Sequence, residues 1–193
     1  MNAFLASCYW LALTIWIAAI LAPAAAGMAV FRVLPQLNGT FPEFTALATA
    51  NQAAIAGGHI VNPLFIFSNV VQLICAAIAI FSLGIEQLYW RPAHHSRADY
   101  VRIPTLLTAT VLILVEICIL GPIAREHLYA YWNAVQSHSM DLANQAKSAF
   151  DALHPVGTTL YAITFGLLLI TVVASAVAYT PSHSSLLGTG NNS

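Results

Sequence analysis

The sequence is poor in charged residues. Only 7% of its 193 residues are Asp, Glu, Lys or Arg, whereas 59% are hydrophobic. Soluble globular chains carry about 25% charged residues. Because this chain has too few polar side chains to cover a water-facing body, its composition excludes an ordinary soluble domain.

The stretches without charge are long. No Asp, Glu, Lys or Arg occurs in residues 1–31, 60–85 or 155–193, and residues 103–124 contain only Glu116. A helix needs about 20 apolar residues to cross the hydrocarbon core of a bilayer. The sequence therefore predicts an all-α integral membrane protein, a single polytopic domain over the whole chain with four transmembrane helices. These spans are placed at 4–30, 63–85, 104–124 and 155–179.

Other absences narrow the function. A phosphate-binding face needs clustered Lys and Arg, and this chain has a net charge of −1, so nucleic acid is not an expected partner. No P-loop, glycine-rich dinucleotide turn or HExxH motif is present, so nothing supports an enzyme. The three cysteines, Cys8, Cys75 and Cys118, lie in apolar spans without CxxC spacing. We expect them to be small buried side chains rather than disulfide partners.

Proline marks the spans. Pro63, Pro104 and Pro155 stand where the first residue of a helix would be, a position that suits proline because its missing N–H needs no partner there. Asn62 and His154 precede two of them and are candidate N-caps. Pro23 lies inside the first span and predicts a kink. That span lacks the basic start of a signal peptide, so we expect it to be retained.

The arginines set the orientation. The short connection 86–102 carries Arg91, Arg97 and Arg102, more than either longer connection. Basic short loops stay in the cytoplasm, so both termini are predicted to be cytoplasmic in a cell membrane, taken to be a bacterial inner membrane. We also expect Glu86 to pair with one of these arginines.

The two longer connections are predicted to form amphipathic helices. In the first, Thr40 and Glu43 have capping-box spacing, and the segment is predicted to end at Gly57-Gly58. In the second, two apolar stripes flank a predicted turn at residues 137–139. Helices of this kind would lie in the membrane interface or cover the outer mouth of the bundle.

Glu116 is the ionisable residue inside a predicted span. It lies about 18 Å from Pro104 along an ideal helix. A carboxylate at that depth costs several kcal/mol, so the group must face the bundle and be either paired or protonated. Arg125 is about 13 Å further along the same helix, too far for direct contact. Glu116 is thus either a proton- or cation-handling group or a neutral cross-link between helices.

Three histidines lie at the predicted outer boundary. His59 precedes the second span, His127 follows the third and His154 opens the fourth. Imidazoles from three helix ends, with Glu116, would suit copper or zinc, and two facing imidazoles could hold a haem. The alternative is that they only cap helices and contact headgroups.

Two passages resemble a known family. FDALHPVGTTLYAITFGLLLITVVA, residues 150–174, is similar to the F-x-x-L-H pattern that opens the last helix of the domain-of-unknown-function-4149 family, whose eukaryotic relatives are called transmembrane protein 205. ILGPIAREH resembles the proline-marked end of that family's third helix. The matching positions are Phe150, Leu153, His154 and Pro122; Glu116 departs from the neutral polar residue expected there. The resemblance implies a four-helix membrane bundle and carries no assigned reaction.

Two functional hypotheses follow. The first is a binding or transport protein for a metal ion, haem or protons in the outer half of the bundle, using Glu116, His59, His127 and His154. The second is a non-catalytic structural or accessory subunit of a membrane complex, in which these groups only hold helices together. Besides the lipid bilayer, the expected partners are other membrane subunits or further copies of the chain.

Overall fold

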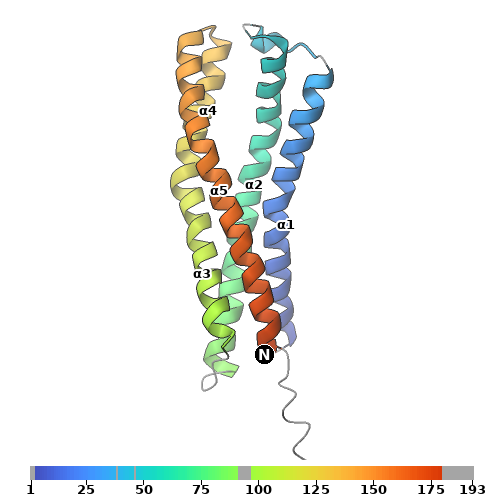
Figure 1. Cartoon of the computed structure of the whole chain (residues 1–193), viewed down its shortest axis with the longest axis vertical. Helices are drawn as coiled ribbons and strands as arrows, with labels where there is room; N and C mark the ends of the chain where they lie inside the picture. The colour runs from blue at the N-terminus through green and yellow to red at the C-terminus, as the bar shows by residue number, and fades with distance from the viewer. Residues whose placement is uncertain (1–2, 38, 46, 91–96, 180–193) are drawn as a thin grey trace, which may run out of the picture.

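The computed structural model describes residues 3–37, 39–45, 47–90 and 97–179, and these residues are helical with short connections. Figure 1 shows the arrangement. The α-helices are α1 (Ala3–Val33), α2 (Thr49–Ile85), α3 (Asp99–Val115), α4 (Gly121–Gln136) and α5 (Met140–Tyr179). Two 3₁₀ helices, η1 (Leu34–Leu37) and η2 (Pro42–Phe44), follow α1, and two π-helical segments are η3 (Glu86–Trp90) and η4 (Glu116–Leu120).

These elements join into four rods. They cover Ala3–Leu37, Asn51–Tyr89, Asp99–Gln136 and Met140–Tyr179, and each is long and apolar enough to cross a membrane. Their 35 to 40 residues give lengths of about 52–60 Å at 1.5 Å per residue. A hydrocarbon core is about 30 Å thick. The prediction of four apolar helices is confirmed, and each rod has a second portion beyond the length needed to cross.

The predicted helix starts at proline are wrong. Pro63, Pro104 and Pro155 lie inside α2, α3 and α5, so Asn62 and His154 are not N-caps. The segments predicted as separate amphipathic helices belong to the first part of α2, to α4 and to the first part of α5. A proline costs one backbone hydrogen bond within a helix, a loss that packing against neighbouring helices compensates.

The first long connection also differs from the prediction. Phe41 is the N-cap of η2 and makes no side-chain capping bond, so the predicted capping box is absent from this helix. Gly57 and Gly58 lie within α2, where a Cβ would come 2.8 Å from the Phe31 ring and 3.3 Å from Trp132 respectively. These glycines allow close packing rather than ending a helix. The predicted turn at 137–139 is confirmed, with His138 at φ 58°.

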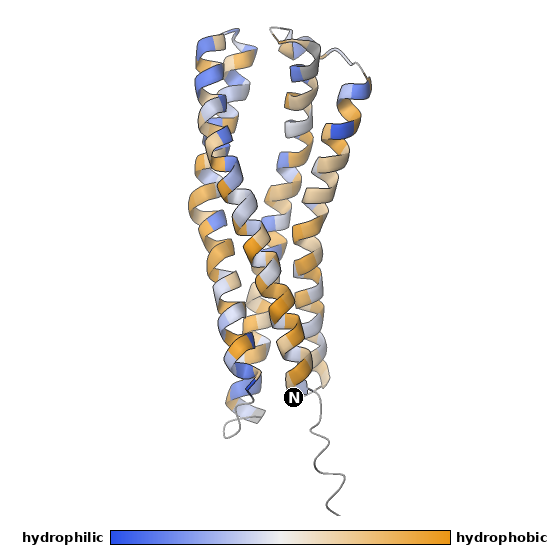
Figure 2. Cartoon of the chain, viewed as in Figure 1, coloured by the Kyte–Doolittle hydropathy of each residue, from blue (hydrophilic) through white to orange (hydrophobic). Residues whose placement is uncertain are grey.

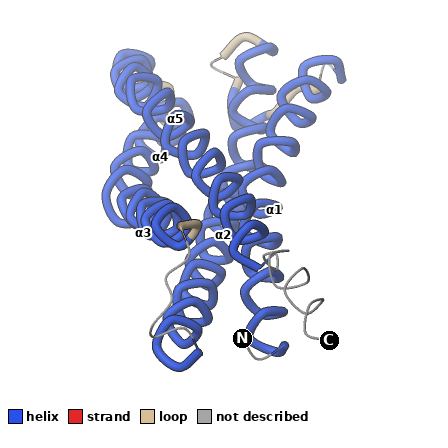
Figure 3. The backbone as a smooth tube through the Cα atoms, turned by 60° about the horizontal axis from the view of Figure 1, so that its bottom comes forward, coloured by secondary structure: helices blue, strands red, loops and turns tan. Residues whose placement is uncertain are grey.

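The rods form two pairs that converge toward one end. α1 runs beside α2, and the α3–η4–α4 rod runs beside α5. The start of α1, the end of α5 and the start of α3 lie together at the end that we call the narrow end (Figures 1 and 3). The opposite, wide end carries more hydrophilic residues, and the narrow half is mostly hydrophobic (Figure 2).

A hydrophobic core holds the narrow half together. Leu13 and Trp16 of α1, Ala79 of α2, Ala109 of α3 and Leu168 of α5 belong to it, and all five are fully buried. Small residues such as Ala79 and Ala109 let helix backbones approach closely, which favours packing where lipid provides no hydrophobic driving force.

Polar side chains join helices within this core. Trp16 Nε1 donates a hydrogen bond to Gln72 Oε1 (3.1 Å), and Gln72 Nε2 donates to Ser68 Oγ (3.0 Å), which connects α1 with α2. On the other side, the Tyr9 hydroxyl lies 2.7 Å from Ser175 Oγ, linking α1 with α5. Because these groups are buried, their mutual bonds remove the cost of leaving them unsatisfied.

An ionic cluster closes the narrow end. The Arg102 guanidinium, fully buried, lies 3.2 Å from Glu86 Oε2 and 2.6 Å from Asp99 Oδ1. Arg102 also donates a hydrogen bond to the Tyr179 hydroxyl (3.0 Å), which itself donates to Glu86 (2.5 Å). The predicted pairing of Glu86 with an arginine is confirmed. The cluster ties together η3, α3 and α5.

We expect Arg102→Gln to destabilise the fold strongly, because it removes the cation between two buried carboxyl groups. Breaking a buried ion pair on one side costs about 3–5 kcal/mol. Lys147→Gln is the control, since its pair with Asp151 is about half exposed and such pairs contribute at most about 1 kcal/mol. Thermal unfolding in detergent micelles measures both; equal losses would contradict the structural role of the cluster.

Candidate ligand pocket

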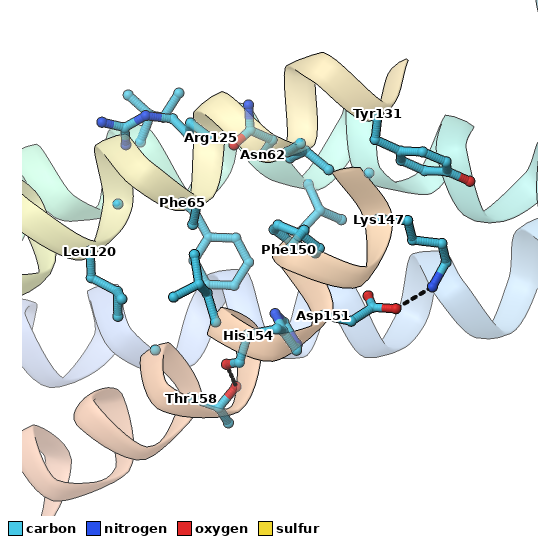
Figure 4. A pocket seen from close by; sticks show the side chains of 18 of the residues that line it. Asn62, Phe65, Leu120, Arg125, Tyr131, Lys147, Phe150, Asp151, His154 and Thr158 are labelled. Carbon is cyan, nitrogen blue, oxygen red and sulfur yellow. Dashed lines mark hydrogen bonds and ion pairs between the residues drawn. The ribbon is translucent and has the colours of Figure 1, made fainter. Parts of the chain in front are cut away.

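A pocket of about 430 Å³ lies between the two helix pairs, in the half of the molecule toward the wide end (Figure 4). All four rods contribute to its lining, which is mostly apolar. Phe31 comes from α1, Phe65 from α2, Leu120 from η4 and Phe150 from α5. Its size is in the range of small-molecule binding sites, about 300–1,000 Å³.

A second hydrophobic core bounds the pocket at the wide end. It contains Phe44 of η2, Ile55 of α2, Trp132 and Val135 of α4, and Ala143 of α5. Ile55 and Trp132 also line the pocket. The narrow-half core bounds the other side through Tyr161, which packs against that core and lines the pocket. The pocket is therefore a gap between two separately packed cores.

His59 belongs to the packing of the wide end. Its ring stacks on Trp132 with centroids 3.7 Å apart and lies 5.8 Å from Phe44. This contact joins α2 to α4 and η2. His59, one of the predicted metal ligands, thus packs against the rings of Trp132 and Phe44.

Glu116 is one of the residues that line the pocket. Its Oε2 atom is buried and has no hydrogen-bond partner in the described part of the chain. A Cβ on Gly157 would lie 3.8 Å from this oxygen, in ordinary van der Waals contact, so a side chain at 157 would fill the space next to the carboxyl. The Tyr161 hydroxyl, nearby in the lining, donates instead to Asn69 Oδ1.

The π-helical segment η4 determines which side chains of α4 face the pocket together with Glu116. Pro122 has no N–H to bond the carbonyl four residues earlier, and just before it the Gly121 N–H bonds to the Glu116 carbonyl, five residues back. In a regular α-helix residues 116 and 125 would be about 180° apart around the axis. One extra residue in the turn reduces this angle to about 80°. Arg125 accordingly lines the pocket together with Glu116.

The same rotation moves His127 away. In a regular α-helix, Ile123 and His127 would lie within about 20° of the face of Glu116. Ala124 and Leu128, each one position later, line the pocket instead, and Ile123 and His127 are not among the described lining residues. The other lining residues of α4 are Gly121, Arg125, Tyr131 and Trp132. The predicted convergence of His127 with Glu116 is therefore not present in this pocket.

Arg125 lines the pocket and has no ionic partner among the residues that the structure describes. Its side chain runs back along the helix, so that Nη1 lies 3.3 Å from the position of a Cβ on Gly121. Among the described residues, ion pairs are formed by Arg102 and by Lys147, and Arg125 and Glu116 form none with each other. The pocket wall therefore carries two opposite charges that are not joined.

The pocket reaches the molecular surface along α5. Asp151, His154 and Thr158 line it and are exposed residues. Lys147 is paired with Asp151, and Thr158 donates a hydrogen bond to the His154 carbonyl (2.9 Å) (Figure 4). His154, predicted as a metal ligand, thus lies at this opening, with its ring 5.7 Å from that of Phe150.

The predicted metal ligands do not assemble as a set. Glu116 and His154 line the same pocket, whereas His59 is stacked on Trp132 and His127 lies on another face. Within the described ranges, no three His, Cys, Asp or Glu side chains form a group that could hold a metal ion. A metal or haem site stays a prediction.

Sequence reasoning missed Arg125, Gly157 and Asn69 as pocket residues. On ideal helix geometry Arg125 lies about 13 Å from Glu116 along the axis, too far for direct contact. The sequence signal for its rotation is the Gly121-Pro122 pair, which the resemblance above assigns to the end of a third helix. In the structure the rod continues through it by way of η4.

We expect Gly121→Ala to destabilise the pocket wall, because its Cβ would lie 2.8 Å from the Glu116 carbonyl oxygen. Overpacking of this kind costs about 1–3 kcal/mol. Gly84→Ala is the matched control: no described neighbour lies within 4 Å of its Cβ position, and alanine favours a helix by about 1 kcal/mol over glycine. Thermal unfolding that shows the two variants equally stable would contradict this role of Gly121.

Comparison with models of known protein families, with curated proteins and with solved structures finds no match to this chain. The resemblance to the domain-of-unknown-function-4149 family therefore stays a prediction.

Proposed function

We propose that the chain is a multi-pass membrane protein that binds a proton or a hydrogen-bond donor of a ligand at Glu116, in a pocket of its outer half. The membrane part of this proposal is supported by four rods of sufficient length and apolarity. Many large apolar side chains on the outside of the rods, such as Phe67, Phe81 and Val173, are exposed, as lipid-facing residues are.

The orientation is proposed from the arginines. The start of α1, the end of α5 and the residues flanking the basic connection lie at the narrow end. If positive residues stay inside, the narrow end faces the cytoplasm and the pocket opens on the outer side. The portions of α2, α4 and α5 toward the wide end then extend beyond the hydrocarbon core.

The buried Oε2 of Glu116 is the observation that carries the binding proposal. An oxygen of this kind in an apolar pocket costs free energy unless it carries a proton or receives a hydrogen bond. The protein supplies no partner for this oxygen within the described ranges, and Gly157 has no side chain to fill the space next to it. Among the ligands expected from the sequence, a proton or a protonated group suits a single carboxyl best, because metal ions are held by several ligands.

The orientation can be tested with cysteine labelling in intact cells, starting from a variant without native cysteines. Ser137→Cys, in the exposed turn at the wide end, should react with a membrane-impermeant maleimide. Arg97→Cys, exposed at the narrow end, should react only after the cells are permeabilised. The reverse pattern would contradict the orientation, and labelling of both in intact cells would contradict membrane crossing.

Proton binding at Glu116 can be tested by infrared difference spectroscopy of the reconstituted protein between acid and alkaline pH. The carboxylic C=O stretching band of a proton-exchanging buried carboxyl should be present in the natural protein and absent from Glu116→Gln. Glu126→Gln is the control, since Glu126 is exposed on α4 and outside the pocket lining. If the carboxylic C=O band is still present in Glu116→Gln, the proposal is contradicted and a purely structural or accessory role is favoured.

A further inference from the structure

We infer that the pocket takes a phospholipid with a primary-amine headgroup, whose ammonium group is bound by Glu116, whose phosphate is bound by Arg125 and whose hydrocarbon chain lies along the pocket's apolar wall. This inference rests on the proposed function of Glu116 as the group that accepts a ligand's hydrogen bond.

The two separated charges are the first argument. Glu116 and Arg125 line one pocket and make no ion pair with each other. The Arg125 guanidinium lies against Gly121, five residues from Glu116 and so about 7 Å along the axis of an ideal helix. Two unpaired charges in an apolar site are costly. A zwitterion with an ammonium at one end and an anion at the other neutralises both.

The chemistry of each group selects its partner. A guanidinium presents donors in a planar fork that matches phosphate oxygens. A carboxylate accepts hydrogen bonds, and a primary ammonium offers three donors. A Cβ on Gly157 would lie 3.8 Å from Glu116 Oε2 and 3.6 Å from Leu120 Cδ2. The absence of that side chain leaves about the volume of a methyl group beside the carboxyl. The headgroup thus has a charge partner for each of its two charged groups.

The apolar wall indicates an attached hydrocarbon chain. Phe31, Phe65 and Phe150 come from three different rods and all line the pocket. Figure 4 shows two of them, Phe65 and Phe150. A soluble zwitterion such as an amino acid would leave most of this surface against water. A lipid chain covers it, and the free energy gained is about 25 cal/mol for each Å² of apolar surface removed from water.

The opening suits entry from a membrane leaflet. His154 and Thr158 are exposed and line the pocket at the same time. On the proposed orientation they lie near the outer boundary of the hydrocarbon core, where lipid headgroups are. A lipid can therefore enter sideways between α5 and the α1–α2 pair without leaving the interface.

The test measures binding of four probes to the full-length protein in detergent by isothermal titration. The probes are lysophosphatidylethanolamine, lysophosphatidylglycerol, lysophosphatidylcholine and phosphoethanolamine. We expect lysophosphatidylethanolamine to bind about tenfold or more tightly than the other two lysolipids, because only its headgroup offers a positively charged N–H donor to the carboxylate. The glycerol headgroup has only neutral hydroxyl donors, and choline has no N–H. Phosphoethanolamine, which has the headgroup without the chain, should bind weakest.

Two variants separate the contributions of the charges. Glu116→Gln should remove the preference for the ethanolamine headgroup, leaving similar affinities for the three lysolipids. Arg125→Gln should weaken all three lysolipids by a similar factor, because each carries the phosphate. Gly166→Ala serves as the neutral control on α5, since no described neighbour lies within 4 Å of its Cβ position.

Gly157→Ala gives a test that does not remove a charge. Its Cβ would make only ordinary contacts with Leu120 and Glu116, so the fold should be kept, yet it occupies the space beside the carboxyl. We expect weaker binding of lysophosphatidylethanolamine in Gly157→Ala and unchanged binding in Gly166→Ala.

Three outcomes overturn the inference. Equal binding of the ethanolamine and glycerol lysolipids by the natural protein would show that no ammonium is recognised. Phosphoethanolamine binding as tightly as its lysolipid would identify a soluble zwitterion instead of a lipid. If no probe binds but the natural protein shows the Glu116 infrared band, the lipid inference is refuted and the proposed proton-binding role stands. If the natural protein lacks that band, the proton-binding role is refuted separately.

Discussion

The hydrogen bond from the Gly121 N–H to the Glu116 carbonyl is the interaction on which the arrangement of the pocket depends. It lengthens one turn of the third rod by a residue, next to a proline that cannot bond in the regular pattern. Beyond this turn the whole of α4 is rotated relative to α3. Ala124, Arg125 and Leu128 consequently face the pocket, and Trp132 reaches the stack with His59 that packs the wide end.

The pocket exists because the bundle has two cores instead of one. The rods are longer than a bilayer's hydrocarbon core, and their halves differ in character. In the narrow half, buried apolar residues such as Leu13 and Leu168 pack closely, and Arg102 closes the end through its ionic cluster. At the wide end, Trp132 and Val135 pack separately with Phe44. The pocket lies between these cores, and Glu116 is part of its lining.

Composition predicted the number and character of the helices well, because long uncharged runs leave few alternatives to apolar helices. It failed at helix ends: Pro63 and Pro155 suggested starts, but tertiary packing carries α2 and α5 through them. Glu116 was identified as unusual from its depth alone. Arg125 and Gly157 could not be assigned to it, since the rotation at η4 depends on hydrogen bonding between residues 116 and 121, and the approach of α5 depends on the whole bundle.

The most direct test of this account is to measure which face of α4, beyond η4, is turned toward the pocket. It can be measured by the reactivity of single cysteines at positions 123, 124, 127 and 128 with a polar maleimide, in a reconstituted protein without native cysteines. The account predicts that cysteines replacing Ala124 and Leu128 react through the pocket, whereas one replacing Ile123 is shielded by lipid and one replacing His127 is not protected by lysophosphatidylethanolamine. A regular α-helix would give the opposite pattern. The cysteine at 123 would react, and lysophosphatidylethanolamine would protect the cysteine at 127 rather than those at 124 and 128. That result would contradict the account.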